Sequence, residues 1–227
     1  MAHIKMLNIK MLICFFLLGY SNSLWAYTPS EGNISTYLGP YFHKSNFETT
    51  ASGTTSPILT GWGLVVLGDV NERGSLEVGI HYLNKYYYSE QNGIETVEKN
   101  GLYHVTMGYR WWFKEYLSAS LSFFSAYSSG DPVVLYTNAP VGSEVKTSAH
   151  DTVEYGVDLA VQFELWNQGL WGAVLDTRYS YSVTPKPGEK ADHYAVMLGL
   201  RYTVQEKFPE SSSQVSEDQI KPEQAKP

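Results

Sequence analysis

Hydrophobic and polar residues alternate with a period of two along most of the chain after residue 26. Such alternation is typical of β-strands with one apolar and one polar face. The pattern is clearest in segments 76–82, 103–113, 117–124, 151–166, 171–183 and 193–204. Two earlier segments, 33–43 and 57–70, look like strands with a less regular pattern. Helical periodicity is hard to find, so the chain is predicted to form eight strands.

Short and long connections alternate between these segments. The connections near 71–74, 114–115 and 167–169 are short, whereas those near 44–56, 87–100, 128–150 and 184–190 are longer and rich in Gly, Ser, Thr, Asn and Pro. Strands joined in this way form an antiparallel up-and-down meander with both ends on the short-turn side. Because closure removes edge strands, the predicted fold is an all-β, eight-stranded antiparallel barrel.

The polar face of the strands distinguishes two kinds of barrel. A soluble lipocalin-like carrier turns its apolar face inward, whereas a transmembrane barrel turns that face outward into lipid. Here the polar face is built mostly of Gly, Ser, Ala and Thr, and its isolated charges nearly balance, which suits a narrow lumen. We therefore predict a lumen charge network of Glu77, Arg110, Glu154, Asp158, Glu164, Asp176, Arg178 and Arg201.

Aromatic residues gather at the two ends of the predicted strands, as they do at the two interfaces of a membrane. The predicted short-turn belt is Trp111, Phe113, Trp166, Trp171 and Tyr202, and the long-loop belt includes Tyr82, Tyr103, Tyr155, Tyr179, Tyr181 and Tyr194. The alternation, the small lumen residues and the two belts together favour an up-and-down transmembrane β-barrel.

This pattern resembles small bacterial outer-membrane β-barrels of the OmpA-transmembrane-domain and OmpX type. Met197–Val204 (MLGLRYTV) is also similar to the final-strand signal read by the barrel assembly machinery, although it is internal and ends in Val rather than Phe or Trp. The resemblance covers residues 27–205 and implies insertion by that machinery. It implies architecture and no single activity.

The N-terminus predicts export. Lys5 and Lys10 precede the apolar run 11–19, which is followed by a small and polar stretch ending at Ala26. This order is typical of a secretory signal peptide, and the run is too short for a spanning helix. We therefore predict a signal peptide at 1–26, an outer-membrane barrel at 27–205 and a disordered periplasmic tail at 206–227, which is rich in Ser, Glu, Gln, Lys and Pro.

Composition narrows the function classes further. The 227 residues carry a formal net charge of −7, which disfavours a nucleic-acid binder with a basic surface. Cys14 is the only cysteine, so neither an intramolecular disulfide nor a cysteine-based zinc site is expected. The histidines show no metal-ligand spacing, and no residue is assigned a catalytic, cofactor-binding or metal-binding role.

The sequence therefore predicts an integral outer-membrane protein with a structural or surface-interaction role, namely envelope integrity, adhesion or small selective passage. Expected partners are outer-membrane lipid and lipopolysaccharide, and the expected state is a monomer. One alternative is an outer-leaflet lipid-modifying enzyme built from loop-end residues (His43, Ser45, Ser148, His150, Asp151, Asp192 and His193). The other alternative is the soluble carrier.

Overall fold

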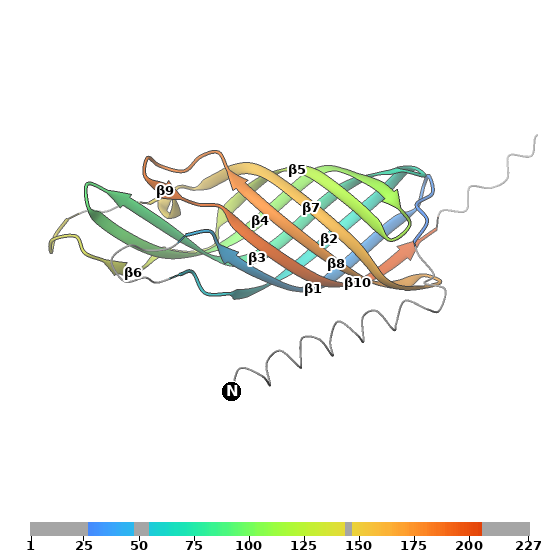
Figure 1. Ribbon diagram of the computed structural model, residues 1–227, viewed down its shortest axis with the longest axis horizontal. Coiled ribbons are helices and arrows are strands. Elements are labelled where there is room, and N and C mark those ends of the chain that lie inside the picture. Colours follow the sequence, from blue (N-terminus) through green and yellow to red (C-terminus); the bar gives the residue numbers. More distant parts are fainter. Residues whose placement is uncertain (1–26, 48–54, 144–146, 206–227) are drawn as a thin grey trace, which may run out of the picture.

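The computed structural model describes residues 27–47, 55–143 and 147–205, and these form a barrel of antiparallel strands (Figure 1). The eight barrel strands are β1 (Ile34–Ser45), β2 (Leu59–Asn71), β3 (Gly74–Gln91), β4 (Ile94–Lys114), β5 (Leu117–Ser128), β7 (Val153–Gln168), β8 (Trp171–Ser182) and β10 (His193–Val204). Two short strands, β6 (Val133–Thr137) and β9 (Glu189–Lys190), and the 3-10 turn η2 (Ser148–His150) lie in the long connections. The predicted signal peptide and tail lie outside the described residues.

The barrel closes through pairing of its first and last strands. β1 pairs with β2 on one side and with β10 on the other, from Ile34 opposite Val204 to Ser45 opposite His193. The remaining pairs follow chain order around the ring, and every pairing is antiparallel. The predicted eight-stranded antiparallel barrel is therefore confirmed.

All three predicted short turns lie at one end of the barrel. β2 and β3, β4 and β5, and β7 and β8 are each joined by two residues between the end of one strand and the start of the next. The start of β1 and the end of β10 lie at the same end (Figure 1). We call this the inner end of the barrel, and the opposite end, which carries the long connections, the outer end.

One predicted loop is wrong. The chain from 87 to 100 is not a loop, because β3 and β4 stay paired as far as Gln91 opposite Ile94. The two-residue turn is Asn92-Gly93, and both residues have positive φ, 54° and 77°. Asn-Gly is a strong signal for this hairpin turn. The hairpin therefore projects beyond the other strands at the outer end (Figure 1).

The alternation changes where this hairpin leaves the barrel. Leu83 and Tyr87 are buried on the inner side of β3, whereas the outward-facing Asn84 is polar. The inward face also buries Lys85, and the outward face also carries Tyr86 and Tyr88, so each face of β3 mixes polar and apolar residues beyond Tyr82. That mixture explains why the apolar-out pattern stops at Tyr82.

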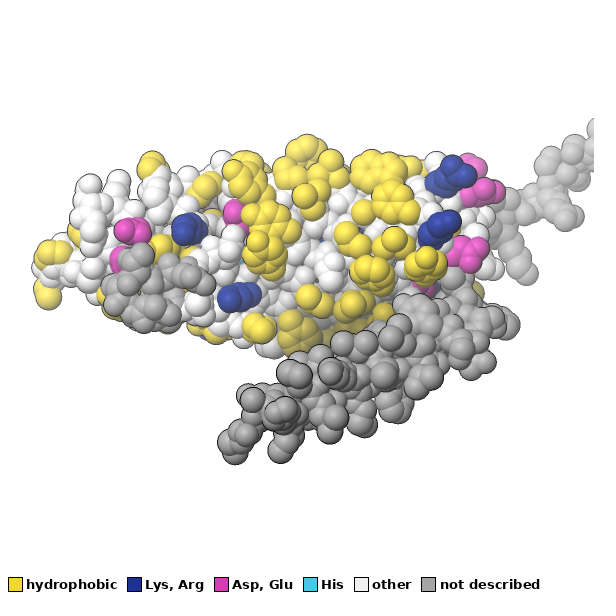
Figure 2. Space-filling model, viewed as in Figure 1, with side chains coloured by type: hydrophobic (Ala, Val, Ile, Leu, Met, Phe, Trp, Pro, Cys, Tyr) yellow, Lys and Arg dark blue, Asp and Glu magenta, His cyan; other side chains and the backbone are white. Residues whose placement is uncertain are grey.

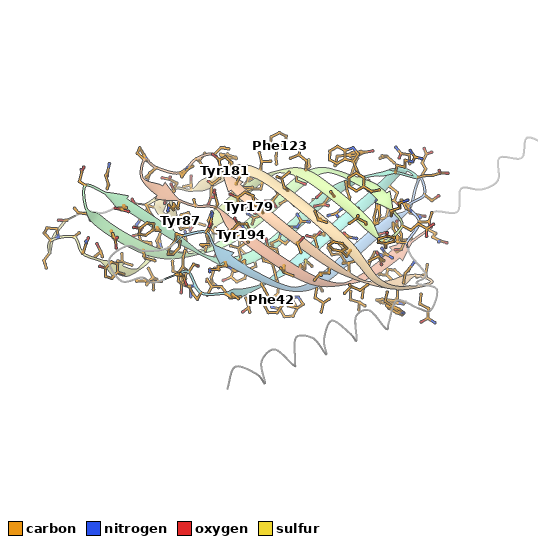
Figure 3. The ribbon with its side chains drawn as sticks, viewed as in Figure 1. Phe42, Tyr87, Phe123, Tyr179, Tyr181 and Tyr194 are labelled. Carbon is orange, nitrogen blue, oxygen red and sulfur yellow. The ribbon has the colours of Figure 1, made fainter. Side chains whose placement is uncertain are left out.

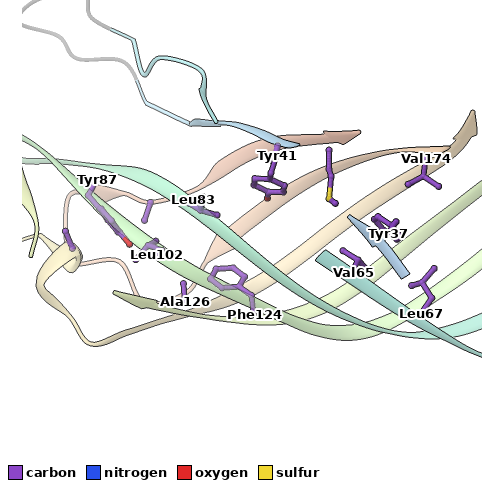
Figure 4. Close-up of a cluster of buried hydrophobic side chains, with 14 of the residues drawn as sticks. Tyr37, Tyr41, Val65, Leu67, Leu83, Tyr87, Leu102, Phe124, Ala126 and Val174 are labelled. Carbon is purple, nitrogen blue, oxygen red and sulfur yellow. The ribbon is translucent and has the colours of Figure 1, made fainter. Parts of the chain in front are cut away.

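Apolar residues lie on both sides of the barrel wall. Inside, Tyr37, Tyr41, Val65, Leu67 and Val174 belong to a buried cluster that fills part of the interior (Figure 4). Four of these five residues come from β1 and β2, so both faces of these strands are partly apolar. This explains why their alternation is irregular in the sequence. In the described part of the chain, no helix is long and apolar enough to cross a membrane.

Candidate functional site

The outer wall of the barrel carries the predicted aromatic belts. All eleven predicted belt residues point outward; ten are exposed, and Tyr179 is half-buried. Neighbouring strands bring several of these rings together, with centroids 5.4 Å apart for Tyr82 and Tyr103 and 4.9 Å apart for Tyr179 and Tyr194. Figure 3 shows the latter pair side by side near the outer end.

The spacing between the belts matches a bilayer. Tyr194 and Tyr202 mark the two belts on β10, and Tyr103 and Trp111 mark them on β4; each pair lies eight positions apart. A tilted transmembrane strand needs about 9–11 residues. The wall between the belts therefore has the height of a hydrocarbon layer.

Between the belts the wall is hydrophobic and exposed. Met107, Phe123, Leu159 and Leu198 are 65%, 77%, 55% and 50% exposed. In the face seen in Figure 2, hydrophobic side chains cover the middle of the barrel and charged side chains lie toward its ends. An exposed apolar surface this extensive is suited to lipid contact. It is the reverse of the carrier alternative, in which the apolar face encloses a ligand.

The middle of the interior holds two arginines bridged by two carboxylates. Glu77 contacts both arginines, at 2.6 Å from Arg110 Nη2 and 2.7 Å from Arg178 Nη2. Asp176 contacts the same two arginines, at 2.9 Å from Arg110 Nη2 and 2.7 Å from Arg178 Nε. All four side chains are fully buried. We call these four residues the central network.

Asp158 extends the central network toward the outer end. One of its oxygens lies 3.6 Å from Arg178 Nη1 and 3.3 Å from His104 Nε2. Tyr37 Oη also donates a hydrogen bond to Asp176 (3.0 Å). Charges removed from water are tolerated only when they are paired and hydrogen-bonded. These contacts supply that compensation across five strands of the barrel: β1, β3, β4, β7 and β8.

The remaining predicted lumen residues form two separate pairs. Glu154 lies toward the outer end and binds Lys85 Nζ at 2.5 Å and Tyr87 Oη at 2.7 Å. Glu164 lies toward the inner end, 2.6 Å from Arg201 Nη1. All eight predicted residues thus lie inside, but in three groups rather than one.

Sequence reasoning missed Lys85, although a signal was present. Lys85 has the same parity along β3 as Glu77 and His81, and its ammonium group is buried. Extending the inward face of β3 by four residues beyond His81 would have included it.

Buried polar contacts also lie at both ends of the barrel. At the inner end, the Arg201 guanidinium lies 4.0 Å from the centroid of the Tyr27 ring, and Tyr27 Oη donates a hydrogen bond to Asp69. At the outer end, Glu98 accepts hydrogen bonds from Thr147 Oγ1 (2.5 Å) and pairs with His150 Nε2 (2.9 Å). The segment around η2 is thereby tied to β4 across the outer mouth.

The hairpin beyond the wall has its own packing. The Phe47 ring stacks on the Tyr88 ring at a centroid distance of 5.3 Å. The single hydroxyl proton of Tyr88 is shared between the carboxylates of Glu90 (3.0 Å) and Glu95 (3.2 Å). Burial and these carboxylates raise the pKa of Tyr88 well above its ordinary value.

The loop-end residues considered for an enzyme form other contacts, although Ser45 lies opposite His193 on the neighbouring strand. Ser148 Oγ donates a hydrogen bond to Glu189, and His150 pairs with Glu98 rather than with a serine. His43 Nε2 lies 2.6 Å from the carbonyl oxygen of Asn84. Within residues 27–47, 55–143 and 147–205, no hydrogen bond joins a serine hydroxyl to a histidine ring.

Four histidine rings gather in the outer half of the interior. Ring centroids are 6.0 Å apart for His81 and His104, 5.4 Å for His104 and His193, and 6.3 Å for His43 and His193. Among the residues that the structure describes, no group of three or more His, Cys, Asp or Glu side chains is arranged to hold a metal ion.

Comparison with solved structures gives the fold a context. No protein-family model and no curated protein matches the chain. The outer membrane protein OprG from Pseudomonas aeruginosa is 9% identical to this chain, with a TM-score of 0.53. The alignment covers 81% of this chain and 100% of OprG. Ail, the attachment invasion locus protein of Yersinia pestis, is 15% identical, with a TM-score of 0.45 over 77% of this chain and 99% of Ail. The likeness to OprG therefore confirms the resemblance to small outer-membrane barrels at the level of architecture.

Proposed function

We propose that this chain is an integral outer-membrane protein whose barrel stands in the bilayer and whose outer end contacts the cell's surroundings. The observation that carries the proposal is the exposed apolar wall between two aromatic belts, around an interior that holds paired charges. Such a surface is unfavourable in water, because each exposed Leu, Phe or Met side chain would gain about 1.5–3 kcal/mol by leaving it. In lipid, every strand of the closed ring also satisfies its backbone hydrogen bonds internally.

Export and assembly complete this proposal. Residues 1–26 act as a cleaved signal peptide, and Met197–Val204 supports recognition by the barrel assembly machinery, because it combines a glycine, an aromatic residue and a terminal apolar residue. The tail 206–227 then lies in the periplasm. Intact-mass measurement of the protein purified from membranes should give a chain that begins at Tyr27. A retained N-terminal segment would reject the cleavage site.

The role we propose is structural or surface-interacting rather than that of a general porin. The central network crosses the interior, and buried polar contacts lie at both ends of the barrel. Single-channel recordings in planar bilayers should therefore show no steady open conductance, because a hydrated ion would have to displace buried ion pairs. A stable conductance of porin size would favour the small-passage role instead.

The outer end supplies a surface for contact with a partner. β6 pairs with β4 at residues 96–99, and no other strand among the described residues pairs with its second side. All five residues of β6 (VVLYT) are exposed, with Val133 and Val134 at 57% and 52%. An exposed apolar edge strand is a template for pairing with another extended polypeptide. This observation favours adhesion over a purely mechanical role.

Two measurements test the membrane placement. The folded protein should migrate differently on a gel before and after boiling, and it should remain in the outer-membrane fraction after alkaline washing. Protease added to intact cells should cut within 128–150 and spare the turn at Glu115 and Tyr116 at the opposite end. Release by alkali would reject the proposal, and cleavage only after permeabilisation would reverse the orientation.

A further inference from the structure

Two hollows adjoin each other on the outer wall, where the outer ends of β1 and β10 meet. The hollow nearer the outer end, called the upper hollow, has a volume of about 480 Å³. It is lined by Lys44, Asn46, Lys190, Asp192 and Tyr194, among others. The hollow nearer the middle of the wall, called the lower hollow, has a volume of about 180 Å³. It is lined on its outward side by Phe42, Ile58 and Val196, together with Lys44 and Tyr194. Lys44 and Tyr194 are cross-strand partners and line both hollows.

The upper hollow is cationic. Lys44 and Lys190 are exposed, and neither forms an ion pair with any residue that the structure describes. Asp192 also lines the hollow and its carboxylate accepts hydrogen bonds from Tyr179 Oη (2.9 Å) and the Ser182 amide (3.3 Å), so the lining carries two cations and one anion. The two ammonium groups are therefore available to a bound anion, and Asn46 adds a side-chain amide to the lining.

The lower hollow is apolar. Phe42, Ile58 and Val196 are 42%, 71% and 41% exposed on the outer wall. Figure 3 shows Phe42 on the outside of the barrel and Tyr194 closer to its outer end. Tyr194 belongs to the outer aromatic belt, so the lower hollow lies at the height of the hydrocarbon layer and the upper hollow lies at the height of the headgroups.

We propose that the two hollows form one binding site for a phosphorylated lipid of the outer leaflet, with a phosphate between Lys44 and Lys190 and an acyl chain against Ile58 and Val196. The inference rests on the proposed membrane placement. A free anion would use the upper hollow alone, and an uncharged lipid would use the lower hollow alone. A ligand with both a phosphate and an acyl chain is the one chemistry that uses both.

The test is lipid binding to the folded full-length mature protein in detergent, measured by native mass spectrometry. The probe is a synthetic acylated disaccharide that carries two phosphates, and the comparison probe is the same molecule without phosphates. A lysine near an anionic lipid surface contributes about 1 kcal/mol, which corresponds to about fivefold in affinity. Lys44→Gln and Lys190→Gln should each weaken binding about fivefold, and the double variant should weaken it about 25-fold.

Two further variants make the result specific. Lys99→Gln removes a half-buried, outward-facing lysine at the same end of the barrel but outside both hollows, and it should leave binding unchanged. Ile58→Ser should weaken binding about threefold or more, because acyl-chain contact is lost. Removal of both phosphates from the probe should have about the same effect as the double lysine variant.

Three results would overturn the site. Equal losses from Lys99→Gln and Lys44→Gln would show diffuse attraction to anionic lipid. Displacement of the lipid by millimolar inorganic phosphate would show a site for free phosphate. An unchanged affinity for Ile58→Ser would remove the acyl-chain half. Vesicle flotation of the same preparation separates these failures from failure of the membrane placement, which would appear as a protein that does not insert at all.

Discussion

Removal of the Arg178 guanidinium is the most direct perturbation of the barrel interior. This side chain is fully buried and contacts Glu77 and Asp176 at 2.7 Å each, with Asp158 at 3.6 Å. Arg178→Met keeps the apolar stem and deletes the charge. Glu77 and Asp176 are then left with Arg110 alone, so the central network changes from two cations and two anions to one cation and two anions.

Breaking a buried ion pair by removing one partner costs about 3–5 kcal/mol, because it leaves an uncompensated charge out of water. We expect a loss of that size for Arg178→Met, measured by urea unfolding of the protein in lipid vesicles with tryptophan fluorescence as the signal. The matched control is Arg73→Met. Arg73 lies exposed in the turn before β3, and its loss should change the free energy of unfolding by less than about 0.5 kcal/mol.

A double-mutant cycle tests the charge balance itself. Glu77→Gln alone leaves two arginines with one carboxylate, and it should also be strongly destabilising. The double variant Glu77→Gln/Arg178→Met keeps Arg110 and Asp176 as a balanced pair, which are 2.9 Å apart. Its loss should be smaller than the sum of the two single losses by at least about 1 kcal/mol, because contacting residues couple by about 0.5–3 kcal/mol. Losses that add within about 0.5 kcal/mol would refute the network.

Three further predictions concern the wall, the hairpin and the surface. Leu159→Arg should lower the free energy of unfolding in vesicles by about 2–4 kcal/mol, since a cation would face the bilayer midplane. The control Tyr136→Arg, at an exposed position of β6, should be nearly neutral, and equal losses would contradict the proposed position of the membrane. Gly93→Val should increase proteolysis at the hairpin tip by opposing the positive φ of that turn, while the urea midpoint of the barrel stays unchanged. Leu135→Lys should reduce adhesion of cells that display the protein, because a charged edge strand resists pairing, and unaltered adhesion would remove β6 from the contact surface.

The sequence alone predicted the strands and their two faces for physical reasons that are local. Side chains alternate across a strand, so the apolar parity of Leu159, Val161 and Phe163 indicates one surface without reference to any neighbour. Short connections require antiparallel neighbours, and these two facts together gave the eight strands, their order and the outward apolar face. Glu77, Arg178 and the other predicted lumen charges were assigned by the same parity, and they lie inside the barrel.

The alternation along a strand shows which face a side chain takes, but it gives neither the distance to another side chain nor the identity of its partner. Strand register and closure between β1 and β10 decide that Glu77 on β3 meets Arg178 on β8, 101 positions away, whereas Glu164 meets Arg201. The full length of the β3–β4 hairpin was also beyond the periodic signal, because both faces of β3 mix polar and apolar residues beyond Tyr82. Tertiary structure alone could place Lys44 and Lys190 around one hollow, since they come from different strands and are brought together by the closure of the barrel.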